Sequence, residues 1–298
     1  MVSPSNPGLS SVSKRVLLFV SAPVCLALLI SSGLFAQSDE WKRLSQQVQS
    51  LSQQGDYKGA IDVAQKALAL AEQELEPEHP AVVVSLESLG DLYVTQGRYA
   101  DAEPLYNRAL AILEKAMGSD NPFVASSLNK LAGLYRKQGR YAEAEPFYQR
   151  SLLVFEKLFG PNHPQVAESL DNLAELYRAE GRYPEAEAFT TRLLFLAEKV
   201  HGPNHPKVAT SSIKLADLYR ARGRYSEAEP LLKRALAIRE KAFGPNHPDV
   251  VVARESYVQL LRATGRETEA NEVAARTKAA PATQLAKKKS GCRECRRQ

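Results

Sequence analysis

Residues 97–118 read GRYADAEPLYNRALAILEKAMG, and residues 139–160 read GRYAEAEPFYQRSLLVFEKLFG. The two stretches align without a gap at a spacing of 42 residues, and two further markers recur along the chain at the same spacing. Self-similarity at a period of this length is typical of repeat proteins, in which successive units stack on one another. The markers are glycines at 55, 97, 139, 181, 223 and 265, and His-Pro or Asn-Pro pairs beginning at 79, 121, 163, 205 and 247.

The residue pattern within each 42-residue period predicts two helices. In the fourth, Pro164 is expected at the first helical position, apolar residues follow at three- and four-residue spacing to Tyr177, and Gly181 ends the helix. A second helix is expected to stop at His201-Gly202-Pro203. Neither helix can bury its apolar face alone, so the pairs must stack into an all-α solenoid of six helix pairs, twelve helices in all. Three prolines are expected in or near the first turn of second helices, at 104, 146 and 230.

The repeated residues resemble the signature of the tetratricopeptide repeat (TPR). The usual TPR has about 34 residues; the longer period here, with Ala-Glu-Pro-Leu-Tyr and Gly-Pro-Asn-His-Pro, is similar to the kinesin light chain type. The resemblance covers about residues 37–276. It implies an α-α superhelix that binds ligands along its first helices. The matching residues of the second unit are Leu89-Gly90, Tyr93, Gly97, Tyr99, Ala102, Tyr106 and Ala109.

Residues 1–36 have the layout of an export signal. An apolar stretch, 16–30, follows Lys14-Arg15, and small residues precede a cleavage site that we expect between Ala36 and Gln37. The sequence therefore predicts an exported, periplasmic or secreted protein. The alternative is an uncleaved anchor that holds the protein at the membrane facing outward.

The positive charge of the chain is concentrated near its C-terminus. The 298 residues carry a net charge of +5, of which residues 1–36 supply +2 and residues 277–298 supply +6, leaving −3 on the repeats at 37–276. Because the body of the protein is not basic, we expect no nucleic-acid partner. We interpret 277–298 as a basic tail.

No catalytic or cofactor motif is present, and no enzyme activity or cofactor is expected. The tail contains one CxxC pair, Cys292 and Cys295, which is half a zinc site, a disulfide or a redox pair. A redox or metal-handling protein that uses the repeats as a docking platform is therefore one alternative. Four histidines recur at the same loop position, where helix capping is favoured over metal binding, at 79, 163, 205 and 247.

The first helices carry polar residues that recur at the repeat spacing and suit recognition of carboxylates and peptide backbone. They predict a protein-interaction scaffold that binds an extended, partly acidic peptide in the groove. Two other interpretations stay open: the arginines pair with neighbours such as Glu175 and Asp217 and bind nothing, or the basic tail meets anionic lipid in a membrane-tethered structural organiser. The candidate residues are Lys130, Arg136, Asn172, Arg178, Lys214, Arg220 and Arg262.

Overall fold

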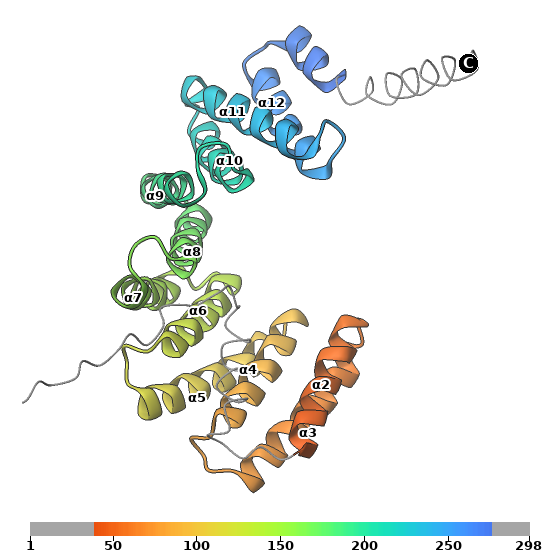
Figure 1. Ribbon diagram of the computed structural model, residues 1–298, viewed down its shortest axis with the longest axis vertical. Helices are drawn as coiled ribbons and strands as arrows, with labels where there is room; N and C mark the ends of the chain where they lie inside the picture. Colours follow the sequence, from red (N-terminus) through yellow and green to blue (C-terminus); the bar gives the residue numbers. More distant parts are fainter. Residues whose placement is uncertain (1–38, 276–298) are drawn as a thin grey trace, which may run out of the picture. The chain divides into compact units, whose positions relative to one another are not determined.

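The computed structural model describes residues 39–275, which contain twelve helices and no strand (Figure 1). The predicted all-α solenoid of helix pairs is therefore confirmed. The helices are α2 (Asp39–Gln53), α3 (Tyr57–Glu74), α4 (Pro80–Thr95), α5 (Tyr99–Met117), α6 (Pro122–Lys137), α7 (Tyr141–Phe159), α8 (Pro164–Glu180), α9 (Tyr183–His201), α10 (Pro206–Ala221), α11 (Tyr225–Phe243), α12 (Pro248–Ala263) and an unlabelled helix over residues 267–275.

Local signals set the ends of the helices. At the start of α8, Pro164 follows the cap His163, and Nδ1 of His163 accepts a hydrogen bond from the backbone N–H of Gln165. At its end, Gly181 has φ +82° in the left-handed conformation, which glycine adopts without a Cβ clash. The next helix ends at His201, as predicted. The pattern repeats at the spacing of 42 residues because the same signals recur.

The prolines of the second helices lie deeper than predicted. Pro104 is the sixth residue of α5, and Pro146 and Pro230 have the same place in α7 and α11. At this position a backbone N–H would ordinarily bond to the carbonyl four residues earlier, so each proline leaves one helical hydrogen bond unmade. The helices nevertheless continue, because their buried faces stabilise them through packing.

The chain divides into two compact units, and α4 contributes to both, because the first unit ends at Ser85 and the second begins at Leu86. In the first unit, α2 packs against α3. Trp41 of α2 is buried, and its Nε1 donates a hydrogen bond of 2.8 Å to the Ser85 hydroxyl. The predicted first helix of the opening repeat is thus formed, and its tryptophan is part of the core.

In the second unit, consecutive helices pack side by side from α5 to α12 (Figure 1). First helices bury apolar residues on more than one side: Leu128, Leu131 and Leu134 of α6 are almost completely inaccessible to solvent. Within residues 39–275, no helix is long and apolar enough to cross a membrane.

Candidate functional site

Most of the candidate cations on the first helices are ion-paired. Lys130 of α6 lies 2.6 Å from Asp91 and 3.3 Å from Glu87, both on α4. Lys214 of α10 bonds to Asp171 and lies 3.5 Å from Glu175, both on α8. These pairs join the first helices of successive repeats, and they reduce the positive charge that an acidic ligand would meet.

Three of the four arginines also have partners. The Arg178 guanidinium lies 2.7 Å from Glu175, which also contacts Lys214, so one carboxylate brings two candidate residues together. Burial raises the pKa of Glu175, but its two cationic neighbours outweigh that effect and leave the pKa below its ordinary value. Arg220 pairs with Asp217 at 2.8 Å and reaches the Gln259 side chain of α12. Arg262 is 3.7 Å from Glu267.

Arg136 differs from these arginines, because no carboxylate of the described residues lies within ion-pairing distance of its guanidinium. Its Nε is buried and has no hydrogen-bond acceptor among them. Arg178 and Arg220 each have an acid three residues earlier, whereas the corresponding residue before Arg136 is Gly133. The guanidinium lies beside the Tyr148 hydroxyl, whose pKa is raised by burial against the influence of Arg136. Asn172 of α8 is half-buried.

Glu168 of α8 is a second polar group in this part of the molecule. Burial raises the pKa of its carboxyl, and Asp171 adds to the rise. The charge of Glu168 also raises the pKa of the Tyr148 hydroxyl, beside which Arg136 lies. We therefore group Glu168 with Arg136 and not with the ion pairs. A guanidinium without a carboxylate partner among the described residues and a carboxyl group of raised pKa thus lie on neighbouring first helices.

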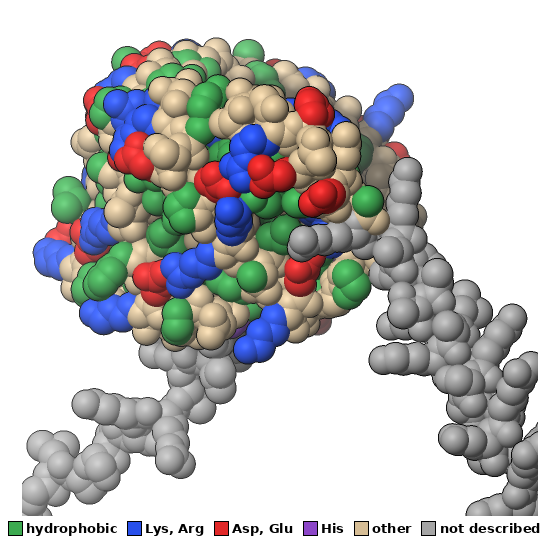
Figure 2. All heavy atoms as spheres, turned by 90° about the horizontal axis from the view of Figure 1, so that it is seen from above, with side chains coloured by type: hydrophobic (Ala, Val, Ile, Leu, Met, Phe, Trp, Pro, Cys, Tyr) green, Lys and Arg blue, Asp and Glu red, His purple; other side chains and the backbone are tan. Residues whose placement is uncertain are grey.

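A ladder of arginines at the starts of the second helices was missed by the sequence reasoning. Arg182 stacks over Tyr177, with the guanidinium carbon 4.4 Å from the ring centre, and bonds to Glu185 at 2.9 Å and to Glu145 of the preceding repeat at 2.8 Å. On the face drawn in Figure 2, basic and acidic side chains likewise lie together at several points. The equivalent pairs between repeats are Arg140–Glu103, Arg224–Glu187 and Arg266–Glu229.

The ladder was detectable in principle. The arginine follows the recurring glycine, in Gly-Arg-Tyr or, at Arg266, Gly-Arg-Glu. Its partner is the glutamate of Ala-Glu-Pro or, at Glu187, Ala-Glu-Ala, so both recur every 42 residues. The arginine and the glutamate are 37 residues apart, so no local sequence pattern connects them. They come into contact only when the repeats stack. These pairs fix one repeat against the next, and they hold the first helices at a constant spacing.

The recurring histidines are helix caps. Nδ1 of His163, His205 and His247 accepts a hydrogen bond from the backbone N–H two residues later, and Nδ1 of His79 does the same. Asn121 makes the equivalent bond with its side-chain oxygen. The predicted capping role is confirmed. Among residues 39–275, no group of three or more His, Cys, Asp or Glu side chains is arranged to hold a metal ion.

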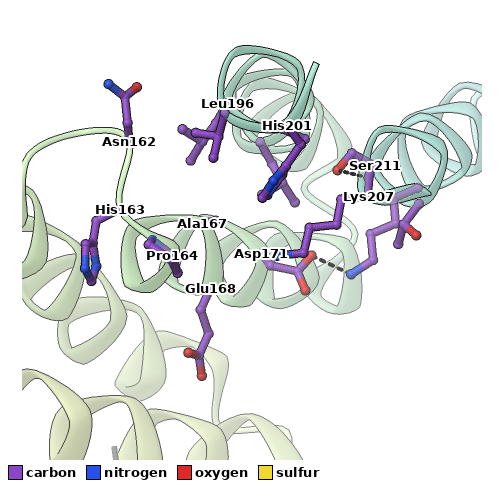
Figure 3. A pocket seen from close by; sticks show the side chains of 15 residues that line it. Asn162, His163, Pro164, Ala167, Glu168, Asp171, Leu196, His201, Lys207 and Ser211 are labelled. Atoms are coloured by element: carbon purple, nitrogen blue, oxygen red, sulfur yellow. Dashed lines mark hydrogen bonds and ion pairs between the residues drawn. The ribbon is translucent and has the colours of Figure 1, made fainter. Parts of the chain in front are cut away.

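A hollow of about 370 Å³ lies between α8, α9 and α10 (Figure 3). Leu196 and His201 extend into it from α9, towards Ala167 of α8, and Lys207 and Ser211 line it from α10. The sequence reasoning did not predict it.

Two predicted features lie outside the described residues. These are the cleavage site at Ala36 and Gln37 and the CxxC pair of Cys292 and Cys295.

Comparison with solved structures supports the fold. A putative kinesin light chain from Podosopora anserina with nearly identical TPR-like repeats is 25% identical, with 70% of this chain and 99% of that chain covered and a TM-score of 0.63. BtubC (BKLC) from P. vanneervenii is 24% identical, with 81% and 92% covered and a TM-score of 0.61. A tetratricopeptide repeat protein from Parabacteroides merdae is 21% identical, with 79% and 78% covered and a TM-score of 0.54. The last two likenesses concern the fold alone.

No curated protein matches this sequence. The tetratricopeptide repeat profile matches residues 44–115, 88–157, 123–195 and 208–249, which together exceed half of the chain. Proteins of this family are generally non-catalytic scaffolds or chaperones that bind other proteins. With its paired helices and its period of 42 residues, this chain belongs to the tetratricopeptide repeat family and is of the kinesin light chain-like type.

Proposed function

We propose that the protein is a non-enzymatic scaffold that binds an extended, partly acidic peptide along its first helices. The observation that carries the proposal is the state of Arg136, the one candidate cation for which the described residues provide no carboxylate. Its Nε is buried without an acceptor. Arg136 as a whole is only half-buried, so a ligand carboxylate can reach its guanidinium and supply the acidic partner that the described residues lack.

The other candidate residues then have a different role. Lys130, Lys214, Arg178 and Arg220 are neutralised by their own acids, so they offer a peptide little net charge. They instead keep the first helices in a constant arrangement before the ligand arrives. A preformed surface loses less conformational freedom on binding, which favours affinity. The proposal therefore assigns recognition of the acidic residue to Arg136.

The test is affinity capture from the native host with the full chain as bait. Arg136→Ala is compared with Arg220→Ala, which removes an arginine that already has an acidic partner. We expect a partner that wild type and Arg220→Ala retain and Arg136→Ala loses. A partner held equally by all three baits would contradict the role of Arg136. Circular dichroism of each variant checks that the helices are intact.

We also propose that residues 1–36 direct the protein out of the cytoplasm. The support is the sequence layout of a basic pair, an apolar stretch and small residues before Gln37. An intact mass that begins at Gln37, measured on protein from the native host, is the expected result. A mass that retains residues 1–36 would instead favour a membrane-anchored protein.

A further inference from the structure

One position that lines the hollow between α8, α9 and α10 carries a small side chain. Ala197 of α9 lines it. At intervals of 42 residues the second unit has Leu113, Phe155 and Arg239 in the equivalent position. Leu113 and Phe155 are almost completely buried. Ala197 therefore has a smaller side chain than its equivalents in the second unit, although Ala71 of the first unit is equally small.

The following repeat shows what fills this space when the side chain is large. Arg239 is buried, and its guanidinium donates hydrogen bonds to the Asp249 carbonyl at 2.8 Å and the Thr210 hydroxyl at 3.2 Å. Thr210 also lines the hollow next to Ala197. At the position equivalent to Ala197, the next repeat thus accommodates a side chain with an apolar methylene chain and a polar guanidinium.

The walls of the hollow are apolar on one side and basic on another. Leu193, Leu196 and Val200 supply apolar surface from α9, and Val200 remains 44% exposed. Lys207 lies in the first turn of α10 and has no ion-pair partner among the described residues. His201, whose ring stacks on His205 at 4.6 Å, adds a further nitrogen base.

The acids of the hollow do not neutralise Lys207. Asp171 is bonded to Lys214, and Glu168 extends from α8 away from Leu196 and His201 (Figure 3). The N-terminus of α10 adds the positive end of a helix dipole beside Lys207. Of the two lysines that line the hollow, Lys207 is therefore the one that no ion pair among the described residues neutralises.

We propose that the hollow binds a small organic carboxylate with an apolar body. The body packs on Ala197, Leu196 and Val200, and it removes from water mainly the exposed apolar surface of Val200. The carboxylate pairs with Lys207 at the start of α10. The carboxylate contacts proposed here do not include Arg136, although Glu168 and Lys214 also line the hollow.

The probes are 4-phenylbutyrate, octanoate and the uncharged 4-phenylbutyramide, titrated into the full chain by calorimetry and ligand-observed NMR. We expect wild type to bind the two carboxylates, and to bind 4-phenylbutyrate roughly fivefold more tightly than its amide. Lys207→Gln removes that preference and leaves the binding of the amide unchanged. Lys199→Gln, which makes the same change in net charge on exposed α9 surface, leaves both affinities unchanged.

Filling the hollow is the second arm of the experiment. Ala197→Phe and Ala197→Leu introduce side chains that earlier repeats already have in this position, and both are expected to abolish binding of all three probes. Two variants are used so that a loss of folding in one, seen by circular dichroism, leaves the other informative. Binding by a folded filled variant, no preference for the carboxylate, or no binding of either carboxylate to wild type would overturn the proposal.

Discussion

At the scale of single residues, a glycine decides which arginine remains available. Gly133 stands where the next two repeats have Glu175 and Asp217, and each of those acids pairs with the arginine three residues later. Arg136 lacks such a neighbour. The residue that distinguishes an arginine with an ion-pair partner from Arg136 therefore lies one helical turn before it.

The space around this glycine leads to a first prediction. A Cβ at Gly133 would meet only the Tyr148 hydroxyl at 3.5 Å, whereas a Cβ at Gly90 would lie 2.6 Å from a ring carbon of Tyr106. Gly133→Ala should stabilise the protein by about 0.5–1 kcal/mol, because alanine loses less backbone freedom in a helix. Gly90→Ala should destabilise it by about 1–3 kcal/mol through overpacking.

Urea denaturation followed by circular dichroism measures both changes. Opposite signs are expected for two identical substitutions in first helices. Equal shifts of the two midpoints would contradict the packing described at Tyr106.

At the scale of the helix, the histidine caps make the starts of first helices sensitive to acid. Each cap accepts its hydrogen bond through Nδ1, which must be unprotonated. Burial lowers the pKa of His79 and His163 below the ordinary value of 6.5. The unfolded chain then binds protons more readily than the folded one, so this stability is present above pH 6.5 and falls as the pH drops below it.

The second prediction follows from Asn121, which caps α6 without titrating. His163→Asn should retain the cap and reduce the loss of stability between about pH 7 and pH 5. His163→Ala should lose about 1 kcal/mol at pH 7, because the cap is absent, and its difference from wild type should shrink towards pH 5, where protonation removes the wild-type cap. Thermal melts at several pH values compare the variants with wild type, and an unchanged pH profile for His163→Asn would argue against the capping explanation.

The arginine ladder provides the third prediction. Arg182 combines a ring contact with bonds to Glu145 and Glu185, a geometry that requires a planar guanidinium. Arg98 makes the ring contact and pairs with Asp101, but Ile61 occupies the position 37 residues earlier. Arg182→Lys should therefore lower the melting temperature more than Arg98→Lys. Equal effects would show that the bond to the preceding repeat contributes little.

At the scale of the whole molecule, the repeat period predicts the elements much better than the site. The ends of α8 at Pro164 and Glu180 follow from His163, Pro164 and Gly181, which act over a few residues. The predicted position of Pro104 in the first turn of its helix was wrong. The sequence pattern does not show how many residues of the helix precede a proline that the helix tolerates. The partner of Arg182 and the hollow at Ala197 depend on side chains brought together by stacking, and no local pattern encodes them.

The ladder also has a consequence for the length of the molecule. Deleting residues 140–181 would bring Arg182 into the place of Arg140, where Tyr135 and Glu103 are the equivalents of its present partners. The shortened protein is expected to keep its helical content per residue by circular dichroism, whereas a deletion of 21 residues would break the register and lose it. Because the contacts between repeats are equivalent along the chain, whole repeats can be gained or lost while these contacts are retained.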